Sequence, residues 1–139
     1  MKSFKIFVSV SLVLLLAYSC NTNESKRPES ALDTGRDFIR ASLDGKFEKA
    51  MPLILQDSQN LQLFETYKIL YKRLPADKKQ NYQKASYTIN KYEDLNDSVT
   101  IINYSNNYMN KPMEIKLVKM TGLWHVDFKY TYSGNLPIE

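Results

Sequence analysis

The side chains best able to do chemistry in this 139-residue chain are its single histidine and a nearby aspartate, His125 and Asp127. A histidine and a carboxylate can transfer protons together or bind a metal ion. Side chains two residues apart lie on the same face of a strand, so this pair would project together. One histidine and one aspartate are too few ligands for a closed metal site. We therefore expect a solvent-facing pair, with a proton-transfer or metal site as the alternative.

Tyrosine is the next residue type with a functional interpretation. The chain contains ten tyrosines, and only Tyr18 precedes the single cysteine, Cys20. Four of the others could line a cavity that stacks on a sugar or another flat ligand: Tyr67, Tyr71, Tyr87 and Tyr130. Core filling explains the same side chains more simply, so we expect core positions and keep ligand lining as the alternative.

Charged side chains gather in two places. Glu93, Asp94 and Asp97 crowd a predicted turn, where we expect them to favour solubility rather than catalysis. Six basic residues surround the end of a predicted helix: Lys68, Lys72, Arg73, Lys78, Lys79 and Lys84. A tethered protein could rest such a surface on anionic lipid headgroups. The solvated side of an amphipathic helix has the same composition and is the interpretation that we favour.

The segment before Cys20 is typical of a secretory signal. Lys2 and Lys5 provide a basic start, and the apolar run over 6–16 is shorter than the roughly 20 residues that a transmembrane helix requires. Removal of 1–19 leaves 120 residues, which suit one domain. The net charge falls from +4 to +2 because the removed part holds two lysines and no acids. So small an excess gives little support to nucleic-acid binding.

The sequence Leu15-Leu16-Ala17-Tyr18-Ser19-Cys20 resembles the lipobox of bacterial lipoproteins, in which small residues precede an invariant cysteine. The resemblance implies that Cys20 becomes the mature N-terminus and carries a diacylglycerol and an acylated amine. It thereby implies a protein of the bacterial cell envelope, anchored to a membrane and expected to face the periplasm. An inert thiol in an ordinary cleaved signal is the alternative. With Cys20 lipidated, no cysteine remains for a disulfide.

The residues after Cys20 predict a short tether and then one domain. Residues 20–29 are polar and contain Pro28, which suits a lipidated flexible tether, and the domain is expected over 30–139. Ser30 can cap the first helix, and Gly45 can end it. Apolar periodicity predicts three helices, over about 30–43, 46–55 and 57–74, with Pro52 restricting the second, and Asp77 can cap one further turn that reaches Tyr82. The apolar stripe of the third comprises Leu63, Phe64, Tyr67, Leu70, Tyr71 and Leu74.

From Ala85 onwards the apolar residues alternate with polar ones, which predicts antiparallel strands. We expect four, over about 85–95, 98–108, 113–120 and 123–132. In the last of them Trp124 and Val126 should share one face, and His125 should lie on the other. The triplet Asp97-Ser98-Val99 also resembles a bacterial O-glycosylation sequon with Ser98 as acceptor, although a hairpin turn accounts for it.

Helices followed by an antiparallel meander resemble the nuclear-transport-factor-2-like (SnoaL-like, cystatin-like) cone. Three sequence features carry this resemblance: Phe38 in the first helix, LDGKFEKA at 43–50 and VKMTGLWHV at 118–126. It implies an α+β fold with N-terminal helices packed on a curved four-stranded antiparallel sheet. Enzymes of that superfamily place acidic or histidine side chains in an apolar cavity, an arrangement that this sequence lacks. The shared motifs specify a fold rather than a reaction.

We therefore expect a non-enzymatic, membrane-anchored lipoprotein of the envelope, without a catalytic site, metal or cofactor, that binds a small apolar ligand or a protein partner through its cone domain. Two alternatives remain. A hydrolase or isomerase would show two or more titratable side chains inside the cavity. An interaction subunit of an envelope complex would show an exposed apolar patch on the sheet.

Overall fold

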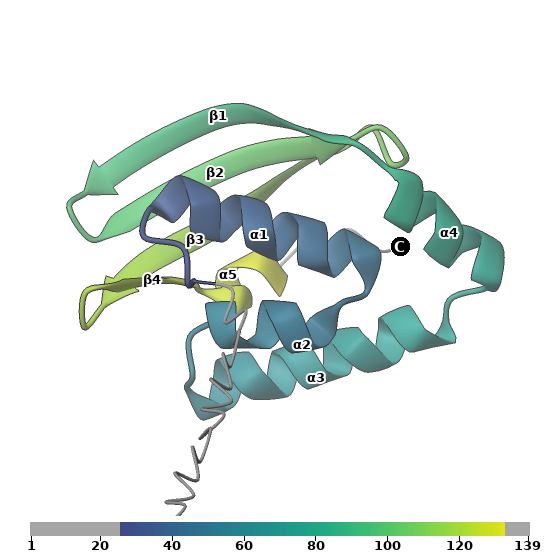
Figure 1. Ribbon diagram of the computed structural model, residues 1–139, viewed down its shortest axis with the longest axis horizontal. Helices are drawn as coiled ribbons and strands as arrows, with labels where there is room; N and C mark the ends of the chain where they lie inside the picture. Colours follow the sequence, from purple (N-terminus) through teal and green to yellow (C-terminus); the bar gives the residue numbers. More distant parts are fainter. Residues whose placement is uncertain (1–25, 133–139) are drawn as a thin grey trace, which may run out of the picture.

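The structure, a computed structural model, describes residues 26–132. The predicted signal peptide, Cys20 and the last seven residues lie outside this range. The described chain is α+β, with helices first and an antiparallel sheet after them (Figure 1). Its elements are α1 (Ala31–Asp44), α2 (Phe47–Ala50), the 3-10 helix η1 (Met51–Leu53), α3 (Ser58–Arg73), α4 (Ala76–Lys84), β1 (Tyr87–Asn96), β2 (Val99–Asn106), β3 (Pro112–Met120), β4 (Leu123–Val126) and α5 (Phe128–Tyr132).

The boundaries predicted for α1 are confirmed by its caps. The Ser30 side chain accepts a hydrogen bond from the Asp33 amide, and Gly45 adopts the left-handed conformation with φ of 68°. Near the middle of α1, Gly35 allows the helix to lie close to the sheet, because a Cβ there would come within 2.5 Å of Ile102 Cδ1. The N-cap, the C-cap and this contact together fix the position of α1 across the inner face of the sheet.

The second predicted helix is interrupted at Pro52. A single α-helical turn, α2, is followed by the 3-10 turn η1. At Ile54 the backbone adopts an extended conformation. Ile54 then forms a parallel bridge with Val126, and the Leu55 amide donates to the Val126 carbonyl at 3.0 Å. The segment after η1 therefore covers part of the free edge of β4.

The third predicted helix is confirmed as α3, with the Asp57 side chain accepting from the Asn60 amide at its N-terminus. Phe64, Tyr67 and Tyr71 are buried as expected. Leu70 was expected in the same stripe and is instead 39% exposed. The buried residues of α3 recur every three or four positions. The face of α3 that meets the core is therefore narrower than the apolar stripe predicted from the sequence.

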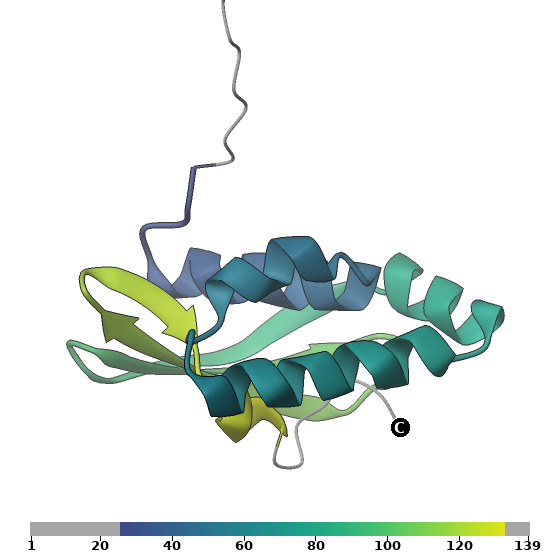
Figure 2. The same cartoon turned by 90° about the horizontal axis from the view of Figure 1, so that it is seen from below.

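The sheet is a four-stranded antiparallel meander with the order β1-β2-β3-β4. Its inner face packs against α1, and in Figure 2 the helices α1 and α2 lie together on one side of the strands. After β4, α5 lies beside β3 and α3 and places Phe128 against Phe38 of α1, at a ring separation of 6.1 Å. Inner-face side chains of the two central strands are at most 3% exposed: Ile102, Tyr104, Met113, Ile115 and Leu117. The concave side of the sheet is thus filled by side chains.

The prediction that the last strand continues to residue 132 is wrong, because β4 ends at Val126. The ladder ends where the Asp127 amide donates to the Lys116 carbonyl at 2.8 Å, and the chain then turns into α5. Two contacts favour this turn. Phe128 is buried in edge-to-face contact with Phe64, at a ring separation of 5.2 Å. The Asn60 side-chain oxygen accepts from the Lys129 amide, which supplies a partner for an N-terminal helix N–H group.

Candidate functional site

His125 and Asp127 do not form a joint site. His125 lies on β4, opposite Val118 and on the face away from Leu117 and Val126, as expected. Its expected exposure is wrong, because the residue is only 9% exposed. Its Nδ1 lies 3.1 Å from the Leu123 carbonyl oxygen. Burial lowers the pKa of His125, and the positive charge of Arg27 lowers it further, which favours the neutral imidazole.

Asp127 lies at the junction between β4 and α5 and faces Lys116. The shortest distance between the Asp127 carboxylate and Lys116 Nζ is 3.7 Å. Within the described residues, no group of three or more histidine, cysteine, aspartate or glutamate side chains is placed to hold a metal ion.

The four candidate tyrosines lie in three different places. Tyr67 and Tyr71 are buried in the aromatic core, where the Tyr71 hydroxyl donates to the Leu43 carbonyl at 3.1 Å. Tyr87 reaches the Arg36 carbonyl on α1, at 3.5 Å. Tyr130 donates to Glu114 on the outer side of β3, at 2.7 Å. These side chains do not line a common cavity, and Tyr67 and Tyr71 fill the core.

The Tyr67 hydroxyl and Ser42 Oγ are both buried in this core and make a hydrogen bond to no third group. Their interaction with each other offsets a small part of the effect of burial on the pKa of Tyr67. Burial raises the pKa of Tyr67 well above its usual value, so the phenol remains neutral.

The acidic turn and the predicted acceptor serine have local structural roles. Asp94 accepts from the Thr100 hydroxyl at 2.6 Å, and Glu93 pairs with Lys91 across the exposed side of β1. Ser98 is exposed in the turn between β1 and β2, and its carbonyl accepts from the Lys119 amide at 2.8 Å.

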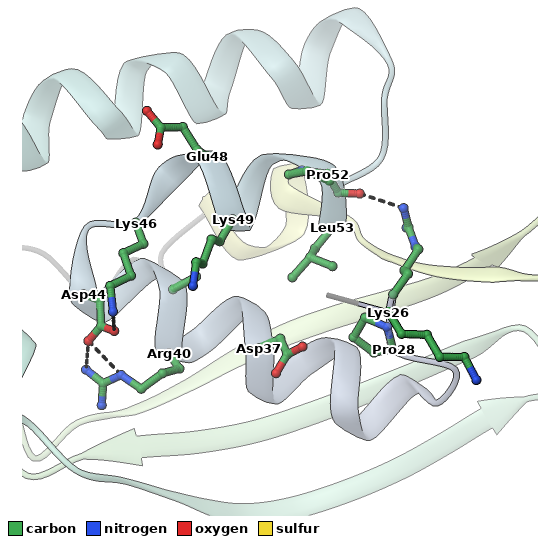
Figure 3. A pocket seen from close by; sticks show the side chains of 12 residues that line it. Lys26, Pro28, Asp37, Arg40, Asp44, Lys46, Glu48, Lys49, Pro52 and Leu53 are labelled. Carbon is green, nitrogen blue, oxygen red and sulfur yellow. Dashed lines mark hydrogen bonds and ion pairs between the residues drawn. The ribbon is translucent and has the colours of Figure 1, made fainter. Parts of the chain in front are cut away.

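The structure instead forms a site that the sequence did not indicate: a groove of about 520 Å³ between α1 and the α2–η1 segment. Asp37 and Arg40 of α1 lie along one side, and Lys49 and Leu53 lie along the other (Figure 3). Lys26, Arg27 and Pro28, which precede α1, line one end. Short α2 and Pro52 create this hollow, because a longer second helix would continue along α1.

Arg27 holds the N-terminal segment against the domain at this end of the groove. Its guanidinium donates to the Pro52 carbonyl at 2.9 Å and to the Trp124 carbonyl at 3.0 Å. The Trp124 carbonyl belongs to the edge of β4 that faces away from β3. One side chain thus joins the segment before α1, the end of η1 and the edge of the sheet. Among residues 26–30, Arg27 therefore makes hydrogen bonds to the domain from within the predicted tether.

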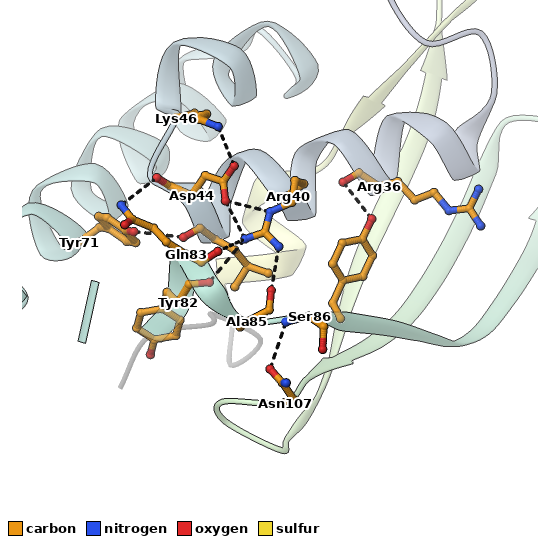
Figure 4. A network of polar contacts seen from close by, with 12 residues as sticks. Arg36, Arg40, Asp44, Lys46, Tyr71, Tyr82, Gln83, Ala85, Ser86 and Asn107 are labelled. Atoms are coloured by element: carbon orange, nitrogen blue, oxygen red, sulfur yellow. Dashed lines mark hydrogen bonds and ion pairs between the residues drawn. The ribbon is translucent and has the colours of Figure 1, made fainter. Parts of the chain in front are cut away.

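Arg40 organises the opposite end of the groove (Figure 4). Its guanidinium forms an ion pair with Asp44 at 2.7 Å and donates to the Ala85 carbonyl at 2.8 Å, just beyond α4. Lys46 pairs with the same Asp44 carboxylate at 2.9 Å. Burial opposes ionisation of Asp44, but the hydrogen bond from Lys46 and the charge of Arg40 outweigh it and lower its pKa. The network fixes α4 to α1.

A second hollow, of about 330 Å³, adjoins the groove and is mostly basic. It is lined by Lys46 and Lys49 of the groove together with Lys68 and Lys72 of α3. Lys68 pairs with Glu65 at 2.8 Å. Within the described part of the chain, Lys49 and Lys72 make no side-chain ion pair. We call the groove and this hollow together the basic face.

A second feature that the sequence analysis missed lies on the outer face of the sheet, at the end of the two hairpins. Val99 pairs with Val118, and Met120 pairs with Leu123, so these apolar side chains share the face turned away from α1. Met120 is 51% exposed and Leu123 is 41% exposed. Ile101 lies on the same face and is half-buried. We call these five residues the outer patch.

Comparison with known proteins gives no match: no family model, no curated protein and no solved structure is similar to this chain. Across the described range, no helix is both long enough and apolar enough to cross a membrane. The functional argument therefore depends on the geometry of the basic face and the outer patch.

Proposed function

We propose that this protein is a lipoprotein of the bacterial cell envelope, held at a membrane by lipid on Cys20 and facing the periplasm, and that its domain binds a protein partner without catalysing a reaction. The partner would bind the outer patch. This proposal selects the protein partner over the small apolar ligand and describes an interaction subunit.

The outer patch is the observation that carries the proposal. Exposed apolar side chains that adjoin on one sheet face are typical of protein interaction sites, whereas isolated ones need no explanation. The register places Val118 beside both Val99 and His125, so the patch spans three strands. The inner face, where a cone would bind a small ligand, is occupied by Ile102, Ile115 and other core side chains.

The assignment of the α+β fold to the cystatin-like cone is part of the same proposal. A four-stranded meander that curves around α1, with α3 beside it, supports a cystatin-like cone (Figure 1). Periplasm-facing attachment is supported by the signal-like residues 1–19 and by the single cysteine that follows them. A lipid anchor with more than one acyl chain binds membranes stably.

Site-specific photocrosslinking in native cells tests the partner. A photoreactive residue placed at Leu123 should give a discrete adduct, and one placed at the exposed position Gln62 on α3 is the matched control. The adduct at position 123 should disappear when Met120 is replaced by Glu, because a charge in the patch must be desolvated on binding. Adducts that persist with Met120→Glu, or that form equally at Gln62, would refute the outer patch as a binding site.

Metabolic labelling with a clickable fatty acid tests the anchor separately. The wild-type protein should be labelled, and Cys20→Ala should not. Equal labelling of both proteins would show that the lipid is attached elsewhere or not at all, whatever the crosslinking shows.

A further inference from the structure

We propose that the basic face binds the phosphate groups of anionic lipids in the membrane to which the protein is anchored. The domain would then lie against the bilayer in one orientation, with α1 and α2 towards the headgroups and the sheet away from them. This inference rests on the proposed lipid anchor and adds to it a specific contact surface.

The first argument is the distribution of charge. The basic face contains seven basic side chains, Lys26, Arg27, Arg40, Lys46, Lys49, Lys68 and Lys72, and three acidic ones, Asp37, Asp44 and Glu48. Its net charge is therefore +4. The chain after residue 19 has 17 basic and 15 acidic side chains and a net charge of +2, so the rest of it carries −2. This face is therefore more positive than the protein as a whole.

The second argument is which of these charges are available. Asp44 is occupied by Arg40 and Lys46. Lys49 and Lys72 are exposed and make no ion pair within the described chain. They flank the second hollow together with Lys46 and Lys68. Lys46 and Lys68 are paired with Asp44 and Glu65, and Glu48 also lines the hollow, so Lys49 and Lys72 are the ammonium groups available to a phosphate there.

The third argument is the point at which the chain leaves the domain. Arg27 fixes this point at the end of the groove, and Figure 2 shows the segment before α1 leaving on the side away from the sheet. Seven residue steps separate Arg27 from Cys20, which span at most about 25 Å when fully extended. The anchor thus keeps the end of the basic face that Arg27 lines within about 25 Å of the membrane.

Contact at this distance is electrostatically favourable. Each basic residue close to an anionic bilayer strengthens binding about fivefold, and the attraction decays within a Debye length of about 8–10 Å. A tether that keeps the domain within a few Debye lengths makes the approach effectively intramolecular. A handful of lysines can then orient a domain that they could not recruit alone.

Lysine footprinting of the lipidated, full-length mature protein tests the proposal. The protein is reconstituted into vesicles of phosphatidylcholine alone, or of phosphatidylcholine with about a third phosphatidylglycerol, and is treated with a water-soluble amine-reactive reagent. Mass spectrometry reports the modification of each lysine and the lipid on Cys20. We expect Lys49 and Lys72 to be at least threefold protected in the anionic vesicles only, and Lys46 and Lys68, which line the same hollow, to be protected with them. Lys91, on the outer side of β1, is the internal control and should react equally in both.

Charge reversal provides the matched variants. Lys49→Glu with Lys72→Glu should abolish the protection of Lys46 and Lys68, whereas Lys91→Glu should leave it unchanged. About 0.5 M salt should also abolish the protection in the wild type. The proposal is overturned if Lys49 and Lys72 react equally in both vesicles, or if they are protected in neutral vesicles as well, since the contact would then not depend on phosphate charge. Unmodified Cys20 would instead refute the lipid anchor.

Discussion

Substitution of Arg27 by alanine tests whether the segment before α1 is part of the domain. Arg27 donates one hydrogen bond in an exposed position, to Pro52, and one in a partly buried position, to Trp124. The exposed bond should contribute little, because water can replace it. A hydrogen bond from a charged donor in a less solvated place contributes about 1.5–3 kcal/mol. Arg27 Nε is itself buried without a partner, which offsets part of this gain.

We therefore expect Arg27→Ala to lower the free energy of unfolding by about 1–2 kcal/mol. Denaturant titration measures this as a lower midpoint at an unchanged slope. Lys26→Ala is the matched control: its side chain is 84% exposed and pairs with an equally accessible Glu29, so its loss should stay within about 0.5 kcal/mol. Arg27→Lys keeps the charge but cannot donate in the same forked geometry, and its effect should be intermediate.

The same variants have a second readout that a purely local loss of stability would not change. The positive charge of Arg27 contributes to the lowered pKa of His125, so Arg27→Ala should raise this pKa. His125 is the only histidine in the chain, and its ring resonance can be followed by NMR without assignment. If Arg27→Ala is no less stable than Lys26→Ala and the pKa of His125 does not move, the contact between Arg27 and the sheet edge does not exist in solution.

Three further predictions concern packing and pH. Gly45→Ala should lower the free energy of unfolding by more than about 1 kcal/mol, because φ is 68° and a Cβ would lie 2.6 Å from Tyr71 Cε1. Gly122→Ala should cost less, because a Cβ there would meet no atom within 4 Å. Phe64→Ala should cost about 3–5 kcal/mol in the same titration. The pKa of His125 is lower in the folded state than in the unfolded chain, so the unfolded chain binds more protons at acidic pH. Stability should therefore fall as the pH drops below about 6.5. His125→Gln should remove the part of this pH dependence that His125 causes. If the free energy of unfolding of His125→Gln depends on pH in the same way as that of the wild type, His125 is not the group responsible.

Features of the fold that depend on local backbone chemistry were predictable from the sequence. Ser30 and Gly45 mark the two ends of α1 because each satisfies a requirement of a helix terminus that few other residues meet. The antiparallel strands followed from alternation of period two. The end of β4 could not be predicted in this way, because residues after Val126 continue to alternate. Their helical conformation depends on Phe128 packing against Phe64 and on a cap from Asn60, which are contacts across more than 60 residues.

The candidate sites depended still less on patterns visible in the sequence. Arg27 lies in a polar run typical of a tether, and its partners are backbone carbonyls, which every residue possesses. The exposure of His125 was misjudged because its face was deduced from alternation, while its burial depends on the environment at the edge of the sheet. Lys49 lies one residue before a buried alanine in a short helix and had no distinguishing signal. Only Lys68 and Lys72 of the basic face belonged to a cluster noticed beforehand.

The basic face lies between α1, the α2–η1 segment and α3, the outer patch lies on the outer face of the sheet, and Arg27 links the two proposals. If Cys20 carries lipid, Arg27 fixes where the tether meets the domain, because it lines the groove and also donates to the Trp124 carbonyl at the edge of β4. Loss of the Arg27 contacts would free the segment before α1 and let the domain rotate about a longer linker. Arg27→Ala should therefore reduce the yield of the crosslink at position 123 as well as the lysine protection in anionic vesicles, to which the charge of Arg27 on the basic face also contributes. A variant that loses lysine protection while the crosslink keeps its full yield would show that partner binding does not require a fixed orientation.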